Sequence, residues 1–150
     1  MTERGNYLPG LGRGPSREDL RTWIDIVQHH AVHFPDDLAL KFLLDGELKE
    51  ACYTYRELDQ KARMVAARLQ AEASPGSGAL LLFPPGLDYI ASFFGCLSAG
   101  MIAVPAYPPD PSPQRRARTL PRLQTIVADS ASTIVLTNSM ILGIAPALYP

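Results

Sequence analysis

Three histidines lie close together near the start of the chain and are the first candidates for chemistry. His29 and His33 are four residues apart, so on a helix their imidazole rings could share a metal ion. No carboxylate or cysteine joins them at a ligand spacing, and solvated or partly packed helix histidines are the simpler interpretation. We therefore assign no metal-binding residue.

The carboxylates and thiols do not form a nucleophile-and-base pair either. Asp36 and Asp37 follow a proline and indicate a polar turn, and Asp88 suits the first turn of a helix, where it opposes the helix dipole. Cys52 and Cys96 lie far apart in apolar surroundings, which predicts buried thiols in a reducing compartment. We therefore assign no catalytic residue.

Glycine-rich phosphate loops are missing from the sequence. Neither G-x-x-x-x-G-K-[ST] nor G-x-G-x-x-G after a strand occurs, and the Gly/Ser-rich residues 74–78 have no lysine beside them. The turn at residues 84–86 is Pro-Pro-Gly, and its prolines lack the amide hydrogens that a phosphate needs. We therefore assign no cofactor-binding residue and expect no plain dinucleotide-binding domain.

A cluster of basic side chains follows the proline-rich residues 105–113. It contains Arg115, Arg116, Arg118 and Arg122 and could meet an anionic partner, such as a carrier protein with a phosphopantetheine arm. A solvated helix face is the alternative. The formal net charge of the whole chain is -1, which favours neither nucleic acid nor a membrane surface.

The elements that would position these residues are clearest over residues 79–109. Residues 79–83 are a continuous apolar run, typical of a strand covered on both faces. Leu87, Ile90, Phe94 and Leu97 give a helix its apolar face, with Gly100 as its C′ residue. Residues 101–104 predict a second buried strand, which implies a right-handed parallel crossover.

Helix and strand patterns alternate along the rest of the chain. A helix is expected from an N-cap at Ser16 to Pro35, with its apolar face at Leu20, Trp23, Val27, Ala31 and Phe34. Residues 38–44 and 51–53 predict two strands joined by a hairpin at Asp45-Gly46. Thr54 and Glu57 form a capping box for a helix that buries Leu58, Ala62, Val65, Ala66 and Leu69.

Residues 120–127 suggest another helix, with Pro121 tolerated only near its first turn. Residues 133–137 predict a third parallel strand, followed by a short helix capped by Asn138 or Ser139. The fold class is therefore α/β, with a largely parallel sheet and helices on both faces. Residues 1–18 predict a flexible tail, and the uncharged residues 89–109 are expected to be a buried helix and strand and not a membrane span.

Several of these segments together resemble one family. They are residues 53–58 (YTYREL), 80–87 (LLLFPPGL), 93–100 (FFGCLSAG), 102–109 (IAVPAYPP) and 122–130 (RLQTIVADS). They are similar to the N-terminal part of fatty acyl-AMP ligases, a branch of the adenylate-forming, acyl-CoA synthetase-like superfamily that includes the ligases at the front of polyketide and lipopeptide synthases.

The resemblance implies a cytoplasmic ligase that uses ATP and magnesium. Such enzymes convert a fatty acid to an acyl-adenylate and pass the acyl group to an acyl carrier protein. The resemblance further implies that residues 19–150 are a partial N-terminal AMP-binding domain, truncated before the phosphate loop, with the remainder of the adenylation domain as its partner.

None of the three lysines, Lys41, Lys49 and Lys61, fits the context of the catalytic lysines of that family. We expect the isolated chain to be an inactive scaffold that binds no cofactor. The alternative is a non-catalytic interaction module that docks a carrier protein or a partner subunit through the prolines and arginines after residue 104.

Overall fold

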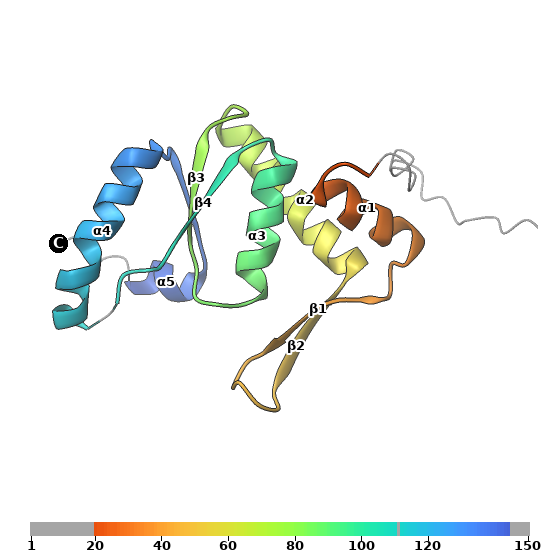
Figure 1. Cartoon of the computed structure of the whole chain (residues 1–150), viewed down its shortest axis with the longest axis horizontal. Coiled ribbons are helices and arrows are strands. Elements are labelled where there is room, and N and C mark those ends of the chain that lie inside the picture. Colours follow the sequence, from red (N-terminus) through yellow and green to blue (C-terminus); the bar gives the residue numbers. More distant parts are fainter. Residues whose placement is uncertain (1–19, 111, 145–150) are drawn as a thin grey trace, which may run out of the picture.

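The computed structural model describes residues 20–110 and 112–144, so the expected tail at residues 1–18 and the expected cap at Ser16 lie outside the described residues. Figure 1 shows the elements along the chain. In order they are α1 (Trp23–His33), β1 (Leu38–Leu43), β2 (Glu50–Thr54), α2 (Tyr55–Glu72), β3 (Gly78–Leu82), α3 (Leu87–Ser98), β4 (Ile102–Ala106), α4 (Pro113–Ser130), β5 (Ile134–Thr137) and α5 (Ser139–Ile144).

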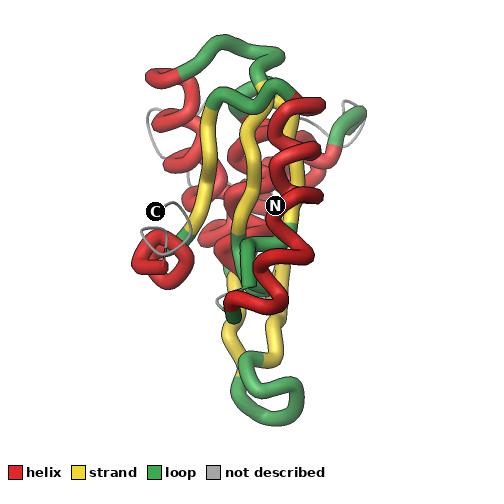
Figure 2. Tube along the Cα trace, turned by 90° about the vertical axis from the view of Figure 1, so that its left-hand side faces the viewer, coloured by secondary structure: helices red, strands yellow, loops and turns green. Residues whose placement is uncertain are grey.

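A parallel three-stranded sheet in the order β4-β3-β5 forms the centre of the fold. β3 pairs with both neighbours, for example through Leu80 opposite Val104 on one side and opposite Val135 on the other. All five residues of β3 are buried, because apolar side chains cover both faces of a central parallel strand. Figure 2 shows the three strands side by side. The predicted α/β class and its parallel crossover are confirmed.

Helices cover both faces of this sheet. On one face Ala79 and Leu81 of β3 pack with α2 and α3, including Leu69 and Cys96. On the other face Leu80 and Leu82 pack with Leu123 of α4. Alternate β3 side chains therefore serve two different cores, as the period of a strand requires.

β1 and β2 form a separate antiparallel hairpin that projects from the body of the fold (Figure 1). Its turn is longer than the Asp-Gly pair predicts, since the strands end at Leu43 and resume at Glu50. The Asp45 carboxylate organises this turn by accepting hydrogen bonds from the backbone amides of residues 47, 48 and 49. These bonds also lower its pKa.

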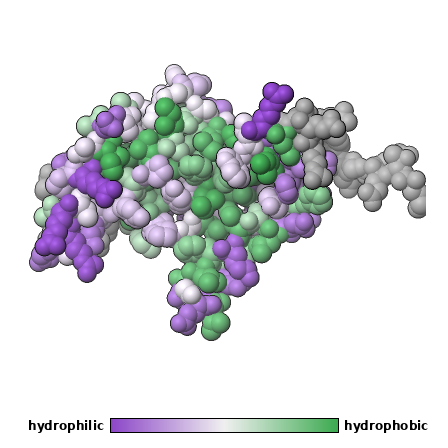
Figure 3. All heavy atoms as spheres, in the orientation of Figure 1, coloured by the Kyte–Doolittle hydropathy of each residue, from purple (hydrophilic) through white to green (hydrophobic). Residues whose placement is uncertain are grey.

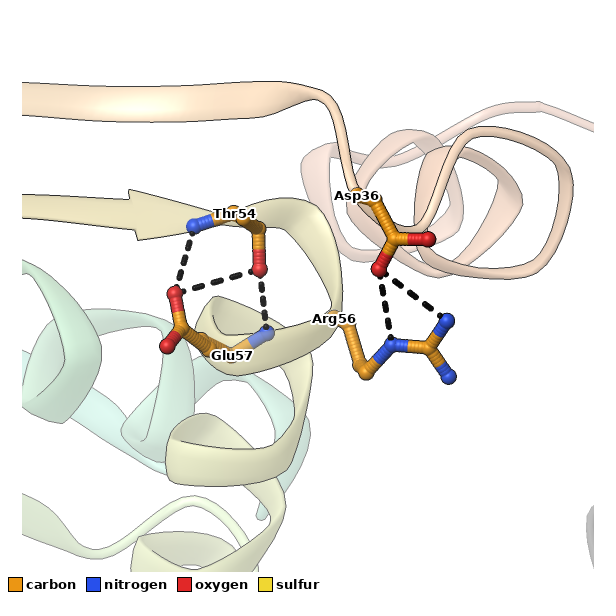
Figure 4. Close-up of polar contacts among 4 residues, drawn as sticks. All are labelled: Asp36, Thr54, Arg56 and Glu57. Atoms are coloured by element: carbon orange, nitrogen blue, oxygen red, sulfur yellow. Dashed lines mark hydrogen bonds and ion pairs between the residues drawn. The ribbon is translucent and has the colours of Figure 1, made fainter.

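The capping box predicted at the start of α2 is confirmed (Figure 4). The amide of Glu57 donates to Thr54 Oγ1 at 3.3 Å, and the amide of Thr54 donates to Glu57 Oε2 at 2.9 Å. Arg56 pairs with Asp36 at 3.2 Å, which ties the turn after α1 to the same helix end. The entry into α2 is thereby fixed between α1 and the hairpin.

The prediction for the first helix is wrong in its start and in its apolar face. α1 begins only at Trp23, because Thr22 and Asp25 form a second capping box there. Trp23 is 70% exposed and Phe34 is also exposed, whereas Val27 is buried. Val27 packs with Leu58 of α2 and Ala91 of α3, so a narrower face than predicted meets the body.

Three further predictions are corrected. The small residues Ala91, Ser92 and Gly95 are buried with Cys96 on α3, and the larger apolar residues predicted for that face are only partly buried. β4 is not a buried strand, because it lies at an edge of the sheet and Ile102 is 60% exposed. α4 begins at Pro113, so Pro121 lies inside the helix and not in its first turn.

Gly95 explains why small residues occupy the buried face of α3. A Cβ atom at this position would lie 2.5 Å from Val65 Cγ1 of α2, closer than atoms can pack. The absence of a side chain lets α2 and α3 approach each other closely. The larger apolar side chains of α3 are only partly buried, with Phe93 packed against one core cluster and Phe94 against another.

Candidate apolar site at the carboxyl end of the sheet

A hollow lies where β3 and β4 end. Its volume is about 520 Å³. Phe83, the Pro84-Pro85-Gly86 turn and the start of α3 form one wall. Pro105 near the end of β4 and Tyr107 just after it form a second wall, and Leu40 and Phe42 of the hairpin form a third. Side chains of mainly apolar character thus converge from three separate segments.

The local sequence explains each wall. The two prolines of the turn at residues 84–86 direct the chain away from the end of β3 and into α3. Alternation along β1 places Leu40 and Phe42 on the same side of the hairpin. Tyr107 follows β4 and is 86% exposed, so its ring lies at the open rim. Figure 3 shows apolar side chains gathered over the hairpin and the centre of the molecule.

Lys41 is the charged residue that lines this hollow. Its ammonium lies 2.9 Å from Glu50 Oε2 on the partner strand. The hydrogen bond and the charge of Glu50 raise the pKa of Lys41 above its usual value. A cation that already has a carboxylate partner is a weak anchor for a second anion, so the hollow favours apolar ligands or an apolar protein segment.

A second, more polar hollow of about 440 Å³ lies on the other side of Phe83, at the carboxyl ends of β3 and β5. Its lining includes Lys61, Asp88, Ser92 and Asn138. The Lys61 ammonium lies 5.0 Å from the centre of the Tyr53 ring, and Tyr53 donates a long hydrogen bond of 3.5 Å to Asp88. Asn138 Oδ1 accepts the amide of Ile141, which confirms Asn138 as the cap of α5.

The histidines lie away from both hollows. His29 and His33 have ring centroids 4.3 Å apart, and His30 stacks on Tyr55 at 4.6 Å. His30 Nδ1 also lies 2.8 Å from the carbonyl oxygen of Ile26. No group of three potential metal ligands occurs within residues 20–110 and 112–144.

The two cysteines differ in their surroundings, and neither is in a disulfide. Cys96 is fully buried, and burial raises its pKa to about 11, so its thiol is a poor nucleophile at neutral pH. Cys52 is exposed, which corrects the prediction of a buried thiol. It lies on β2 of the projecting hairpin, where burial alternates along the strand: Ala51 and Tyr53 are half-buried and Cys52 between them is exposed.

The lining of the two hollows is a poor fit to magnesium and to the phosphates of ATP. Asp88 is the one carboxylate among the residues that line the two hollows, and magnesium takes several oxygen ligands. The turn beside the larger hollow begins with two prolines, so it offers few amide donors.

Sequence reasoning did not find the larger hollow. Residues 83–87 and Tyr107 lie in two of the segments that resemble the family. That resemblance was the only sequence signal that pointed to two walls of the hollow. The third wall comes from the hairpin, whose position over the end of β3 depends on the packing of α1, α2 and α3. No local sequence pattern predicts that the hairpin lies over the end of β3.

A parallel sheet with helices on both faces and a hollow outside the carboxyl ends of its strands defines an open-sheet α/β domain, the class of fold in which ligands commonly bind at that edge. The pattern of the AMP-binding enzyme family matches residues 27–148. The chain therefore belongs to the family of AMP-binding enzymes.

No helix among the described residues has the length and apolar character needed to cross a bilayer.

Several known proteins share this sequence and fold. The medium-chain-fatty-acid–[acyl-carrier-protein] ligase of Moorena producens is 43% identical over 82% of this chain and 20% of the ligase. A long-chain-fatty-acid–AMP ligase of Mycobacterium tuberculosis is 33% identical over 77% of this chain and 20% of that protein.

Among solved structures, the fatty acyl-adenylate ligase of Legionella pneumophila, in complex with acyl adenylate and pyrophosphate, matches with a TM-score of 0.71 and 42% identity. This match covers 80% of this chain and 20% of that ligase. The chain thus spans about a fifth of the length of each of these three relatives.

Proposed function

We propose that this chain supplies the N-terminal scaffold of a fatty acyl-AMP ligase. In the proposed reaction a fatty acid carboxylate attacks the α-phosphorus of ATP, and pyrophosphate leaves as the acyl–phosphate bond forms. A carrier protein thiol then attacks the acyl carbon and releases AMP. The observation that carries the proposal is the match to the Moorena and Legionella ligases above 40% identity over four fifths of this chain.

The groups that bind ATP and magnesium are proposed to come from outside these 150 residues. The lack of a phosphate loop in the sequence and the poor fit of the described residues to magnesium both support this division. The proposed domain therefore runs from residue 19 and depends on the remainder of an adenylation domain. Two cysteines without a disulfide support a reducing, cytoplasmic location.

The test is a segment exchange. Residues 20–144 of this chain replace the matching segment of the Moorena ligase, and fatty-acid-dependent exchange of pyrophosphate into ATP is measured. We expect exchange by the chimera and none by the isolated 150-residue chain. A chimera that melts like the Moorena ligase but shows no exchange would contradict the assignment to this reaction, and exchange by the isolated chain would contradict the scaffold role.

We further propose that the larger hollow holds part of the alkyl chain of the fatty acid. Its apolar walls and the paired state of Lys41 support this, because an alkyl chain needs apolar burial and no counter-ion. In the chimera, Phe42→Ala should move the preferred acyl length upward and Phe42→Trp should move it downward. Leu48→Ala, in the exposed turn of the hairpin, is the matched control. An unchanged preference in both Phe42 variants would exclude this role.

A further inference from the structure

The exposed side of α4 carries three arginines in a row. Arg115, Arg118 and Arg122 stand at positions i, i+3 and i+7 of the helix, a spacing that places side chains along one side. All three are exposed, whereas Leu123 is buried against the sheet. We call these three residues the arginine flank. Figure 3 shows strongly hydrophilic side chains at the end of the molecule that α4 occupies in Figure 1.

Little within the described residues neutralises this flank. Arg115 lies 3.8 Å from Asp110, and its side chain is 79% exposed. Arg118 and Arg122 have no carboxylate within ion-pair distance in residues 20–110 and 112–144. By comparison, three arginines of α2 have ion-pair partners at 3.2 Å or less. The positive charge of the flank is therefore available to a partner molecule.

The placement of these charges also works against the stability of α4. Helices α1, α2 and α3 each carry an acidic residue in the first turn, namely Asp25, Glu57 and Asp88. α4 has no acidic residue there and begins with arginines, which the positive end of the helix dipole repels. Arg118 and Arg122 are four residues apart and repel each other. The short helix α5 also lacks an acidic residue in its first turn, but of these two helices only α4 places arginines there, and such a departure from a local rule indicates a functional surface.

We propose that the arginine flank docks the acidic surface of the acyl carrier protein, an inference that rests on the proposed ligase function. Guanidinium groups bind carboxylates and phosphodiesters with two parallel hydrogen bonds. A carrier protein that delivers a phosphopantetheine thiol brings a phosphodiester with it. The Moorena relative is named as a ligase that acts with an acyl carrier protein. The flank steers that partner and does not take part in adenylate formation.

The test separates the two half-reactions in the chimera. Acyl-adenylate formation is measured as pyrophosphate exchange, and acyl transfer is measured on the holo carrier protein that the Moorena ligase uses. Reversal of charge in R118E/R122E should raise the KM for the carrier protein about tenfold with pyrophosphate exchange unchanged. R118K/R122K keeps both charges and should return most of the affinity. Added salt should weaken transfer by the parent chimera more than transfer by R118E/R122E.

The control removes two positive charges elsewhere. K49E/R68E changes the net charge equally, and both residues are exposed on the hairpin turn and on α2. We expect it to leave the KM for the carrier protein within twofold. An equal rise in KM for both charge-reversed variants would show a net-charge effect and would overturn the docking surface. So would an unchanged KM in R118E/R122E, or loss of its pyrophosphate exchange. Absence of exchange in the parent chimera would count against the ligase function itself.

Discussion

Gly95 sets the distance between the two helices that cover one face of the sheet. Its replacement by alanine places a methyl group 2.5 Å from Val65 Cγ1, and neither helix can move without disturbing buried Leu69 and Cys96. We expect Gly95→Ala to lower the free energy of unfolding by about 1–3 kcal/mol, measured by denaturant titration.

The matched control for this substitution is Gly143→Ala in α5, where a new Cβ meets no atom within 4 Å and where stability should not fall. Val65→Ala in the Gly95→Ala background should recover part of the loss, because it removes the clashing methyl groups. Equal stability of the Gly95→Ala variant and the parent would show that the helices are not in close contact.

The two thiols should react very differently with a thiol reagent. Cys96 is buried with a pKa of about 11, whereas Cys52 is exposed. Since only the thiolate is nucleophilic, we expect one rapid labelling event at pH 8 and a second only after unfolding in guanidinium. Cys52→Ser should abolish the rapid event and leave the slow one. Rapid labelling in that variant would mean that the α3 face opens readily.

Among the secondary-structure elements, α2 depends on its capping box. Thr54→Ala removes the acceptor for the amide of Glu57, and such a loss costs about 1 kcal/mol. We expect a corresponding decrease in the free energy of unfolding by chemical denaturation. Thr54→Ser keeps the hydroxyl and should be nearly neutral, so a loss of the same size in both variants would assign the effect to the lost methyl group.

The elements show how far sequence patterns can predict this fold. Capping boxes, apolar runs and turn residues act over a few positions, and they predicted β1, β3, β5 and the start of α2 correctly. The apolar face of α1 was not predictable, because Val27 is buried only through contact with Leu58 and Ala91. The predicted start of α4 was wrong because a proline inside a helix is unfavourable. In the structure Pro121 lies inside α4, on the exposed side of the helix.

The candidate site was less predictable than the fold. Two of its walls are local segments, the turn at residues 84–86 and the exit from β4, and both stood out in the sequence. The wall from the hairpin depends on tertiary packing that brings the hairpin to the end of β3, and no short-range sequence pattern predicts that packing. The assignment of no catalytic, metal-binding or cofactor-binding residue from the sequence stays a prediction.

The whole molecule exposes both outer strands of its sheet. β4 and β5 each have one neighbour among the described strands, and Ile102 and Val135 are more than half exposed. Unpaired strand edges of this kind pair with other chains. We expect the isolated chain to self-associate at tens of micromolar, seen as early or broad elution in size-exclusion chromatography.

Lysines at exposed edge positions should reduce this association, so I102K/V135K should elute later and as a narrower peak than the parent chain. The variant with lysine at the exposed hairpin residue, Leu48→Lys, is the control and should elute like the parent. A sharp monomer peak of the parent chain at the same concentration would contradict the role of the edges.

The strand order β4-β3-β5 has a consequence for biosynthesis. Thr137 donates to the carbonyl of Leu82 across 55 residues of sequence, so the second flank of β3 is completed long after the first. β4 ends at Ala106 and β5 at Thr137, so at a translation rate of about 5–20 residues per second the ribosome needs roughly 2–6 s after β4 to deliver the missing strand. Throughout that interval the nascent β3–α3–β4 unit presents an open strand edge with unpaired backbone groups between apolar side chains, and this is the stage at which a chaperone would have most to protect.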